Sequence, residues 1–114
     1  MEMKLTPRFF RDGEAFFGPG VAELLEQVQH HRSLRAAAAS MEMAYSKAWR
    51  IVRNAESGFG CKLLNSTTGG RNGGGAVLTA EGEAVMDAYH RFSEEINTYS
   101  QARFQAHFGD WQEL

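Results

Sequence analysis

The segment that most constrains this chain is residues 33–52, whose pattern is typical of two short helices joined by a tight turn. Ser33 can cap the first helix by accepting hydrogen bonds from backbone N–H groups that have no partner within the helix. The alanines at positions 36–39 make that helix thin enough to pack closely against a neighbour. A second periodic run begins after the tripeptide Met41-Glu42-Met43. The expected unit is therefore a helix, a turn of about three residues and a second helix.

The second helix is expected to be strongly two-sided. Its apolar face carries Ala44, Ala48, Ile51 and Val52. Its opposite face carries Tyr45, Ser46, Lys47, Arg50 and Arg53. An apolar stripe opposite a cationic and hydroxyl face is the pattern of a helix-turn-helix that reads DNA. An ordinary helical hairpin with a solvated charged face has the same local pattern, so the rest of the chain must distinguish the two.

The net charge of −2 argues against a nucleic-acid partner, but the charges are unevenly distributed. Residues 31–72 hold seven Lys and Arg against two Glu, a local charge of +5. Residues 73–114 hold two Arg against seven acidic residues, a local charge of −5. A polyanion responds to the local field rather than to the average charge. We therefore expect a basic middle segment that binds DNA in a salt-sensitive way.

The N-terminal residues predict a β-hairpin followed by a helix. Residues 5–10 and 15–17 read as strands around a turn centred on Asp12-Gly13, with Pro7 placing the first strand at a sheet edge. Pro19 suits the first turn of a helix. That helix shows one apolar stripe over two turns, formed by Val21, Leu24, Leu25 and Val28.

A second hairpin is predicted after the helix-turn-helix, which we expect to end near Ser57-Gly58. Residues 61–65 and 76–78 are strand candidates, and the segment between them is rich in glycine. This segment lacks the Gly-Lys-Ser/Thr of a phosphate-binding loop, and a strand rather than a helix follows it. A wing that approaches the DNA backbone fits better, with three residues able to contact phosphate: Thr67, Thr68 and Arg71.

Thr79 is expected to cap a long final helix over residues 79–106, with Glu81 and Glu83 well placed in its first turn. Apolar residues then recur at spacings of four, three, four and three, which is the period of a two-helix seam. They are Val85, Tyr89, Phe92, Ile96 and Tyr99. Such a helix would be ~40 Å long, so we expect the seam to pair with a second copy. The alternative is that the helix folds back over the N-terminal hairpin and uses part of the same stripe.

Several function classes have little support in the sequence. Cys61 is the single cysteine, so an intrachain disulfide is impossible, and we expect a small buried side chain in a reducing, cytoplasmic compartment. His30 and His31 are adjacent, so they point to different helix faces, and no third ligand has a matching spacing. No Ser/His/Asp or Cys/His grouping suggests an enzyme. No apolar run approaches the ~18 residues of a membrane span.

Three stretches resemble a known family. Ser33 with the following alanines, the sequence YSKAW at 45–49, and TGGRNGGGAVLT at 68–79 are similar to the N-terminal DNA-binding domain of the ModE family of molybdate-responsive transcriptional regulators. The broader pattern is similar to the LysR-type winged helix-turn-helix. The resemblance covers residues 5–99. It implies a homodimer whose long terminal helices pair and whose recognition helices enter successive major grooves.

The chain departs from the family pattern at the turn. The family usually has Gly where this chain has Glu42, and Ser as the recognition-helix cap where this chain has Ala44. Losing a hydroxyl cap costs ~1 kcal/mol, and a non-glycine residue at positive φ costs about as much. The family's C-terminal oxyanion-binding domains have no counterpart in these 114 residues, so molybdate sensing is not carried over.

Together these features predict an α+β, mainly α, winged helix-turn-helix with an N-terminal β-hairpin and a long C-terminal dimerisation helix. We expect one domain over residues 1–114, with the helix-turn-helix at 33–57, the wing at 61–78 and the dimerisation helix at 79–106. The predicted function is a homodimeric regulator of palindromic operator DNA, without a cofactor. The predicted DNA-binding residues are Ser33, Arg35, Tyr45, Ser46, Lys47, Arg50, Thr67, Thr68 and Arg71. The alternatives are a protein-interaction module and a small oxyanion-binding protein that uses the glycine loop.

Overall fold

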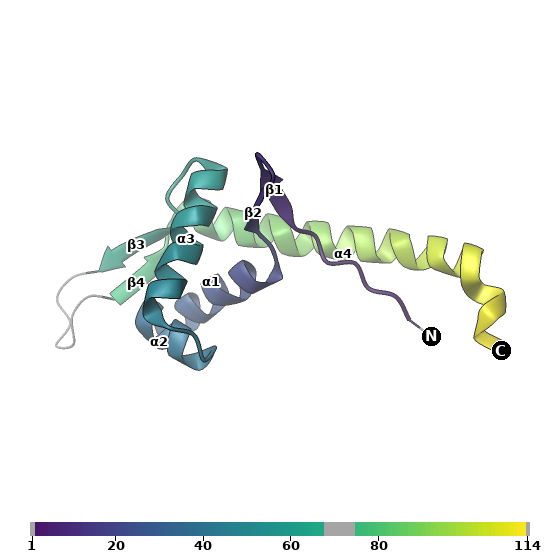
Figure 1. Ribbon diagram of the computed structural model, residues 1–114, viewed down its shortest axis with the longest axis horizontal. Helices are drawn as coiled ribbons and strands as arrows, with labels where there is room; N and C mark the ends of the chain where they lie inside the picture. Colours follow the sequence, from purple (N-terminus) through teal and green to yellow (C-terminus); the bar gives the residue numbers. More distant parts are fainter. Residues whose placement is uncertain (1, 68–74, 114) are drawn as a thin grey trace.

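The computed structural model describes residues 2–67 and 75–113 and has an elongated shape of 60 × 28 × 23 Å. A compact body lies at one end, and a single long helix extends away from it (Figure 1). The elements in chain order are β1 (Phe9–Arg11), β2 (Glu14–Phe17), α1 (Pro19–His31), α2 (Leu34–Ser40), α3 (Tyr45–Phe59), β3 (Leu64–Thr67), β4 (Gly75–Leu78), α4 (Ala80–Phe108) and the 3-10 helix η1 (Gly109–Glu113). The predicted α+β winged helix-turn-helix architecture is confirmed.

The core lies where α1, α2 and α3 meet the two hairpins. The predicted stripe on α1 is confirmed, because Leu24, Leu25 and Val28 are fully buried. Alanines on α2 and α3 allow close helix packing, and Phe17 closes the core from the N-terminal hairpin. The large fully buried side chains are worth about 1.5–3 kcal/mol each in transfer free energy. This core holds α3 in place beneath its exposed face.

The N-terminal hairpin is shorter than predicted. Strand β1 begins at Phe9, so residues 5–8 are not a strand. Instead they run along α4: the Leu5 N–H donates to Asn97 Oδ1 (3.0 Å), Asn97 Nδ2 donates to the Leu5 carbonyl (2.9 Å), and the Tyr89 hydroxyl donates to the Pro7 carbonyl (2.7 Å). Because α4 takes these hydrogen bonds, Pro7 lies before the sheet rather than in it.

The C-terminal end of α3 also differs from the prediction. Helix α3 continues through Gly58 to Phe59, and Gly60 caps it in the left-handed conformation (φ 75°). Gly58 is buried inside the helix, where a Cβ would lie 2.1 Å from Phe16 Cδ2. Glycine at position 58 therefore allows the N-terminal hairpin to pack closely against α3, and it does not end the helix. Arg11 reinforces this contact, since its Nη2 donates to the Gly58 carbonyl at 2.7 Å.

The wing consists of β3, β4 and the residues between them in sequence. Strands β3 and β4 pair antiparallel, with Leu64 opposite Leu78 and Thr67 opposite Gly75. Strand β3 begins at Leu64, three residues later than the predicted strand, because Lys62 and Leu63 are engaged at the start of α4. The predicted phosphate contacts Thr68 and Arg71 lie outside the described residues. Thr67 is exposed at the end of β3.

Helix α4 confirms the predicted long final helix, and its cap is confirmed as well. The Thr79 hydroxyl oxygen accepts a hydrogen bond from the Gly82 N–H at 2.9 Å, and Glu81 and Glu83 lie in the first turn. With 29 residues it is ~43 Å long. In the part of the chain that the structure describes, no helix is long and apolar enough to cross a membrane.

The predicted seam on α4 divides into two parts. Tyr89 is 6% exposed and packs in the chain's own core, with its ring 5.0 Å from Phe17 and 5.7 Å from Phe9. Val85 also packs against this core. This part of the stripe follows the fold-back alternative, so Tyr89 has little surface left for a second chain. Tyr99, in contrast, is 71% exposed.

Candidate nucleic-acid interface

Helix α3 has a buried face and an exposed face, as predicted. Ala48, Val52 and Ala55 are buried against the core, while Ser46 and Arg50 are exposed. Ala44 is not part of the buried face: it precedes the helix as its N-cap and is exposed. The helix therefore presents a row of polar and cationic side chains on a rigid support.

The turn before α3 has the two predicted weaknesses. Glu42 adopts the left-handed conformation (φ 54°), where glycine is normally favoured. Ala44 caps α3 without a side-chain hydrogen bond. The turn is held by backbone hydrogen bonds instead, including Met43 N–H to the Ala38 carbonyl at 2.9 Å. Tight backbone pairing thus compensates for side chains that do not suit the turn.

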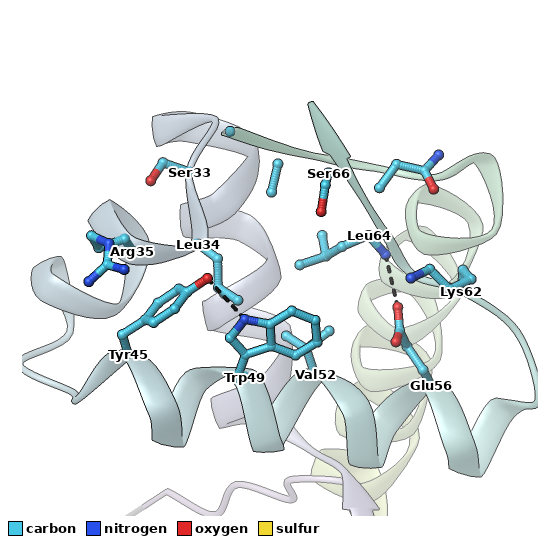
Figure 2. Close-up of a pocket in the computed structure, with 13 residues that line it drawn as sticks. Ser33, Leu34, Arg35, Tyr45, Trp49, Val52, Glu56, Lys62, Leu64 and Ser66 are labelled. Atoms are coloured by element: carbon cyan, nitrogen blue, oxygen red, sulfur yellow. Dashed lines mark hydrogen bonds between the residues drawn. The ribbon is translucent and has the colours of Figure 1, made fainter. Parts of the chain in front are cut away.

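A cleft of about 190 Å³ lies between α3, the N-terminal end of α2 and the wing (Figure 2). Ser33 and Arg35 enter it from α2, Tyr45 and Trp49 from α3, and Ser66 from β3. Ser33 also caps α2, since its Oγ accepts a hydrogen bond from the Ala36 N–H at 3.0 Å. Three of the predicted DNA-binding residues, Ser33, Arg35 and Tyr45, are thus brought together.

Two aromatic side chains form the α3 wall of the cleft. Trp49 Nε1 donates a hydrogen bond to the Tyr45 hydroxyl oxygen at 2.9 Å (Figure 2). The Arg35 guanidinium carbon lies 4.2 Å from the Tyr45 ring centroid, and that of Arg53 lies 4.9 Å from the Trp49 ring centroid. Both distances are within the range of cation–π attraction. We call these four side chains the arginine–aromatic ladder.

Glu56 joins α3 to the base of the wing. Its Oε2 accepts a hydrogen bond from the backbone N–H of Leu64 at 3.3 Å (Figure 2). It also accepts one from the backbone N–H of Leu63 at 2.9 Å. Leu64 is the first residue of β3, and Leu63 immediately precedes it. A carboxylate in the basic region is therefore used to fix the wing relative to α3.

The cationic face of α3 keeps its charge available. Among the described residues the salt bridges are Lys4–Glu2 and Arg91–Asp87, both far from α3 in sequence and both exposed. Arg50 and Arg53 are thus not neutralised by any carboxylate that the structure describes. Such a face attracts phosphate groups and is screened by salt.

Lys47 lies on a different edge of α3 from the cleft. It lines a groove beside the N-terminal hairpin together with Met41, Met43 and Ile51. Lys47 is exposed, as predicted, but it does not line the cleft that contains Tyr45. Trp49 and Arg53 were absent from the predicted site. The four-residue spacing of Tyr45, Trp49 and Arg53, which places them on one edge of a helix, is the signal that could have identified them.

In residues 2–67 and 75–113, no three His, Cys, Asp or Glu side chains come together as a metal-binding group. A helix, its capped neighbour and a two-stranded wing that share one cationic cleft define a winged helix-turn-helix of the nucleic-acid-binding class.

Comparison with known proteins agrees with this class. Residues 21–83 match the model of the bacterial regulatory helix-turn-helix proteins of the LysR family. The match covers α1, α2, α3, the wing and the start of α4. The chain therefore belongs to the LysR-type family of bacterial regulatory helix-turn-helix proteins.

Curated relatives narrow the resemblance to ModE-like regulators. The transcriptional regulator ModE of Yersinia pestis is 33% identical over 89 residues, which are 78% of this chain and 32% of that protein. ModE of Haemophilus influenzae is 32% identical over 74 residues (65% and 29%). The molybdenum-pterin-binding protein MopA of Rhodobacter capsulatus is 30% identical over 79 residues (69% and 30%). The chain spans about a third of the length of these relatives.

Proposed function

We propose that this protein is a homodimeric, cytoplasmic transcriptional regulator that binds palindromic operator DNA. The observation that carries the proposal is the exposed cationic face of α3 beside the wing, whose Arg50 and Arg53 have no described carboxylate partner. Membership of a regulatory helix-turn-helix family supports DNA as the partner.

In the proposed complex α3 enters the major groove. Ser46 and Arg50 are exposed on its outer face and reach base edges, where one good contact discriminates by ~1–3 kcal/mol. Ser33, Arg35 and Thr67 contact the sugar-phosphate backbone on the wing side. Tyr45 lines the same cleft. Lys47 contacts phosphate on the hairpin side of α3. Thr68 and Arg71 extend the backbone contacts from the wing.

The proposed dimer forms through α4. The exposed large side chains Phe92 and Tyr99 lie on the predicted seam, and Ile96 lies between them, half-buried. To enter successive major grooves, the two α3 helices of this dimer would have to lie about 34 Å apart. Two half-sites then bind together with a higher affinity than one.

The regulated genes are proposed to serve the transport of molybdate or another metal oxyanion. The support is the similarity to regulators named ModE and to a protein named molybdenum-pterin-binding. The chain spans about a third of the length of those relatives, and no effector is proposed for it.

Selection of genomic DNA fragments by the purified protein, with and without molybdate, tests the proposal. We expect enrichment of a palindromic sequence, followed by fluorescence anisotropy that shows weaker binding at higher salt. Absence of enrichment together with absence of binding at low salt would refute DNA recognition. An enriched site that lies away from oxyanion-transport genes would refute only the link to those genes.

A protein-interaction module is the second candidate. The net charge of −2 and the exposed aromatic side chains Phe108 and Trp111 near the C-terminal end of α4 favour it. This candidate predicts a stable protein partner in pull-down experiments and no sequence-specific DNA complex. The DNA selection therefore separates the two candidates.

A further inference from the structure

We propose that Tyr45 and Trp49 are positioning residues which hold Arg35 and Arg53 ready for two phosphate contacts before DNA arrives. This inference rests on the proposed function and goes beyond it, because it assigns a role to the arginine–aromatic ladder as a unit. The ladder joins two elements, with Arg35 from α2 and the other three side chains from α3.

The two rings are fixed relative to each other. Trp49 Nε1–H is used by the Tyr45 hydroxyl oxygen, so the indole has no N–H donor left for a base or a phosphate. Trp49 is 37% exposed although it is a large apolar side chain. An exposed indole with its donor occupied is poorly suited to hydrogen-bonded readout and well suited to support a neighbouring cation.

Each ring carries one arginine. The guanidinium carbon of Arg35 lies 4.2 Å from the Tyr45 ring centroid, and that of Arg53 lies 4.9 Å from the Trp49 ring centroid. A guanidinium has five N–H donors, so one held over a ring by cation–π attraction keeps donors for phosphate oxygens. The two cations are thus separated by the Tyr45–Trp49 pair, one at each end.

Holding an arginine in place matters because a long side chain loses conformational freedom when it binds. In this protein the aromatic rings restrict the two arginine side chains already in the folded, DNA-free state, so less conformational freedom is left to lose on binding. Removing a ring should therefore weaken binding through its arginine, not through a direct contact of the ring with DNA.

A double-mutant cycle tests this coupling with the DNA fragment enriched in the selection. Arg53→Ala is expected to weaken binding about tenfold and to reduce the slope of log K against log salt by ~0.9, the value for one phosphate. Trp49→Leu is expected to weaken binding severalfold. Because Trp49 is proposed to act through Arg53, the double variant is expected to have the same affinity as Arg53→Ala alone. A double loss equal to the product of the single losses would overturn the proposal.

Two controls make the result specific. Tyr45→Phe keeps the ring under Arg35 and removes only the hydroxyl, so its effect is expected to stay within about threefold, the weight of one neutral hydrogen bond. A loss as large as that of Arg53→Ala would contradict the positioning role. The helical far-UV circular dichroism spectrum is expected to be retained in Trp49→Leu, because Trp49 lies outside the core.

A measurement without DNA separates this proposal from the proposed function. In the free protein, the side-chain protons of Arg53 should show ring-current shifts in NMR spectra that disappear in Trp49→Leu. If these shifts are absent in the wild-type protein, the ladder is refuted even when DNA binds. If the shifts are present and no DNA binds at low salt, the proposed function fails and the phosphate role of the ladder fails with it.

Discussion

The cleft beside α3 and the C-terminal half of α4 both expose side chains that proteins usually cover, but their chemistry differs. At the cleft, Arg35 lies over the Tyr45 ring, and next to it Arg53 lies over the Trp49 ring. Neither arginine forms a salt bridge with a carboxylate among the described residues. The C-terminal half of α4 exposes Tyr99 (71%) and Phe108 (50%). The first surface suits a polyanion, and the second suits another apolar helix.

The contrast indicates that the proposed DNA contact and the proposed dimer contact would use different surfaces of the molecule. A cationic surface that stays hydrated can exist in a monomer, whereas exposed aromatic side chains along a helix favour association. DNA binding and dimerisation should therefore be separable by substitution, and both depend on the packing that holds α3 and α4 to the body.

The largest effect is expected from Tyr99→Asp. A carboxylate on the proposed seam would be buried without a partner, so the dimer should dissociate to monomers in sedimentation equilibrium. Affinity for a palindrome should fall about 100-fold or more, the loss expected when two linked binding events become separate. Affinity for a single half-site should not change. Tyr99→Phe is the matched control and should remain dimeric. A dimeric Tyr99→Asp would show that α4 pairs elsewhere or not at all.

The next largest effect is expected at Gly82, where α4 packs against the backbone of Leu63. A Cβ at Gly82 would lie 2.3 Å from the carbonyl oxygen of Leu63, which is backbone and cannot move away freely. Gly82→Ala is expected to lower the free energy of unfolding by about 1–3 kcal/mol. Gly20→Ala, in the first turn of α1 with nothing within 4 Å, is the control and should be neutral or slightly stabilising. Urea denaturation measures both, and equal effects would contradict the close packing at Gly82.

A smaller effect is expected at the start of α3. Ala44→Ser supplies the missing side-chain cap and should raise the free energy of unfolding by about 0.5–2 kcal/mol. Ala39→Ser makes the same change at an exposed position in the last turn of α2 and should be slightly destabilising. DNA affinity should change little in either variant. If Ala44→Ser does not stabilise the protein in thermal melts, α3 does not begin where the structure places it.

The smallest effect is expected from Tyr89→Phe, which removes the hydrogen bond to the Pro7 carbonyl. Burial raises the pKa of the Tyr89 hydroxyl above its ordinary value of 10.0, while neighbouring Ser93 and the charge of Arg8 oppose this. Because the folded state holds this proton more tightly, the stability that it contributes is present below pH 10 and is lost as pH rises above it. Wild-type stability should therefore fall more steeply above pH 10 than that of Tyr89→Phe. Parallel pH profiles would contradict the assignment.

The helices of this fold follow well from the sequence because their signals are local. Ser33 and Thr79 predict helix starts because their hydroxyl oxygens can cap a helix, and the structure contains both capping hydrogen bonds. The stripe on α1 and the two faces of α3 follow from spacing alone. The left-handed Glu42 was predictable from the length of the turn and the family pattern.

The errors arose where a partner distant in sequence decides the outcome. Gly58 looks like a helix stop, but its role depends on Phe16, which comes from the N-terminal hairpin. Residues 5–8 have a strand pattern, but α4 supplies their hydrogen bonds. Tyr89 fits a seam between two chains equally well as the core of one chain, since periodicity does not identify what covers a stripe.

The candidate site was predictable in part for the same reason. Arg35 and Tyr45 were expected near DNA from their places on α2 and α3, and the structure brings them into one cleft. The stacking of Arg35 on Tyr45 across the turn, and the placement of Lys47 on the opposite edge of α3, depend on how α2, α3 and the hairpin pack. No spacing rule contains that information.

The central claim is that DNA is bound by the exposed face of α3. Its most direct test is to compare Arg50→Ala with Arg91→Ala on the same palindromic DNA by fluorescence anisotropy at two salt concentrations. Arg50 lies on α3, whereas Arg91 is an exposed residue of α4 paired with Asp87 at 3.1 Å. The account predicts a loss of about 10- to 100-fold for Arg50→Ala and unchanged affinity for Arg91→Ala. Equal affinities for the two variants would contradict it.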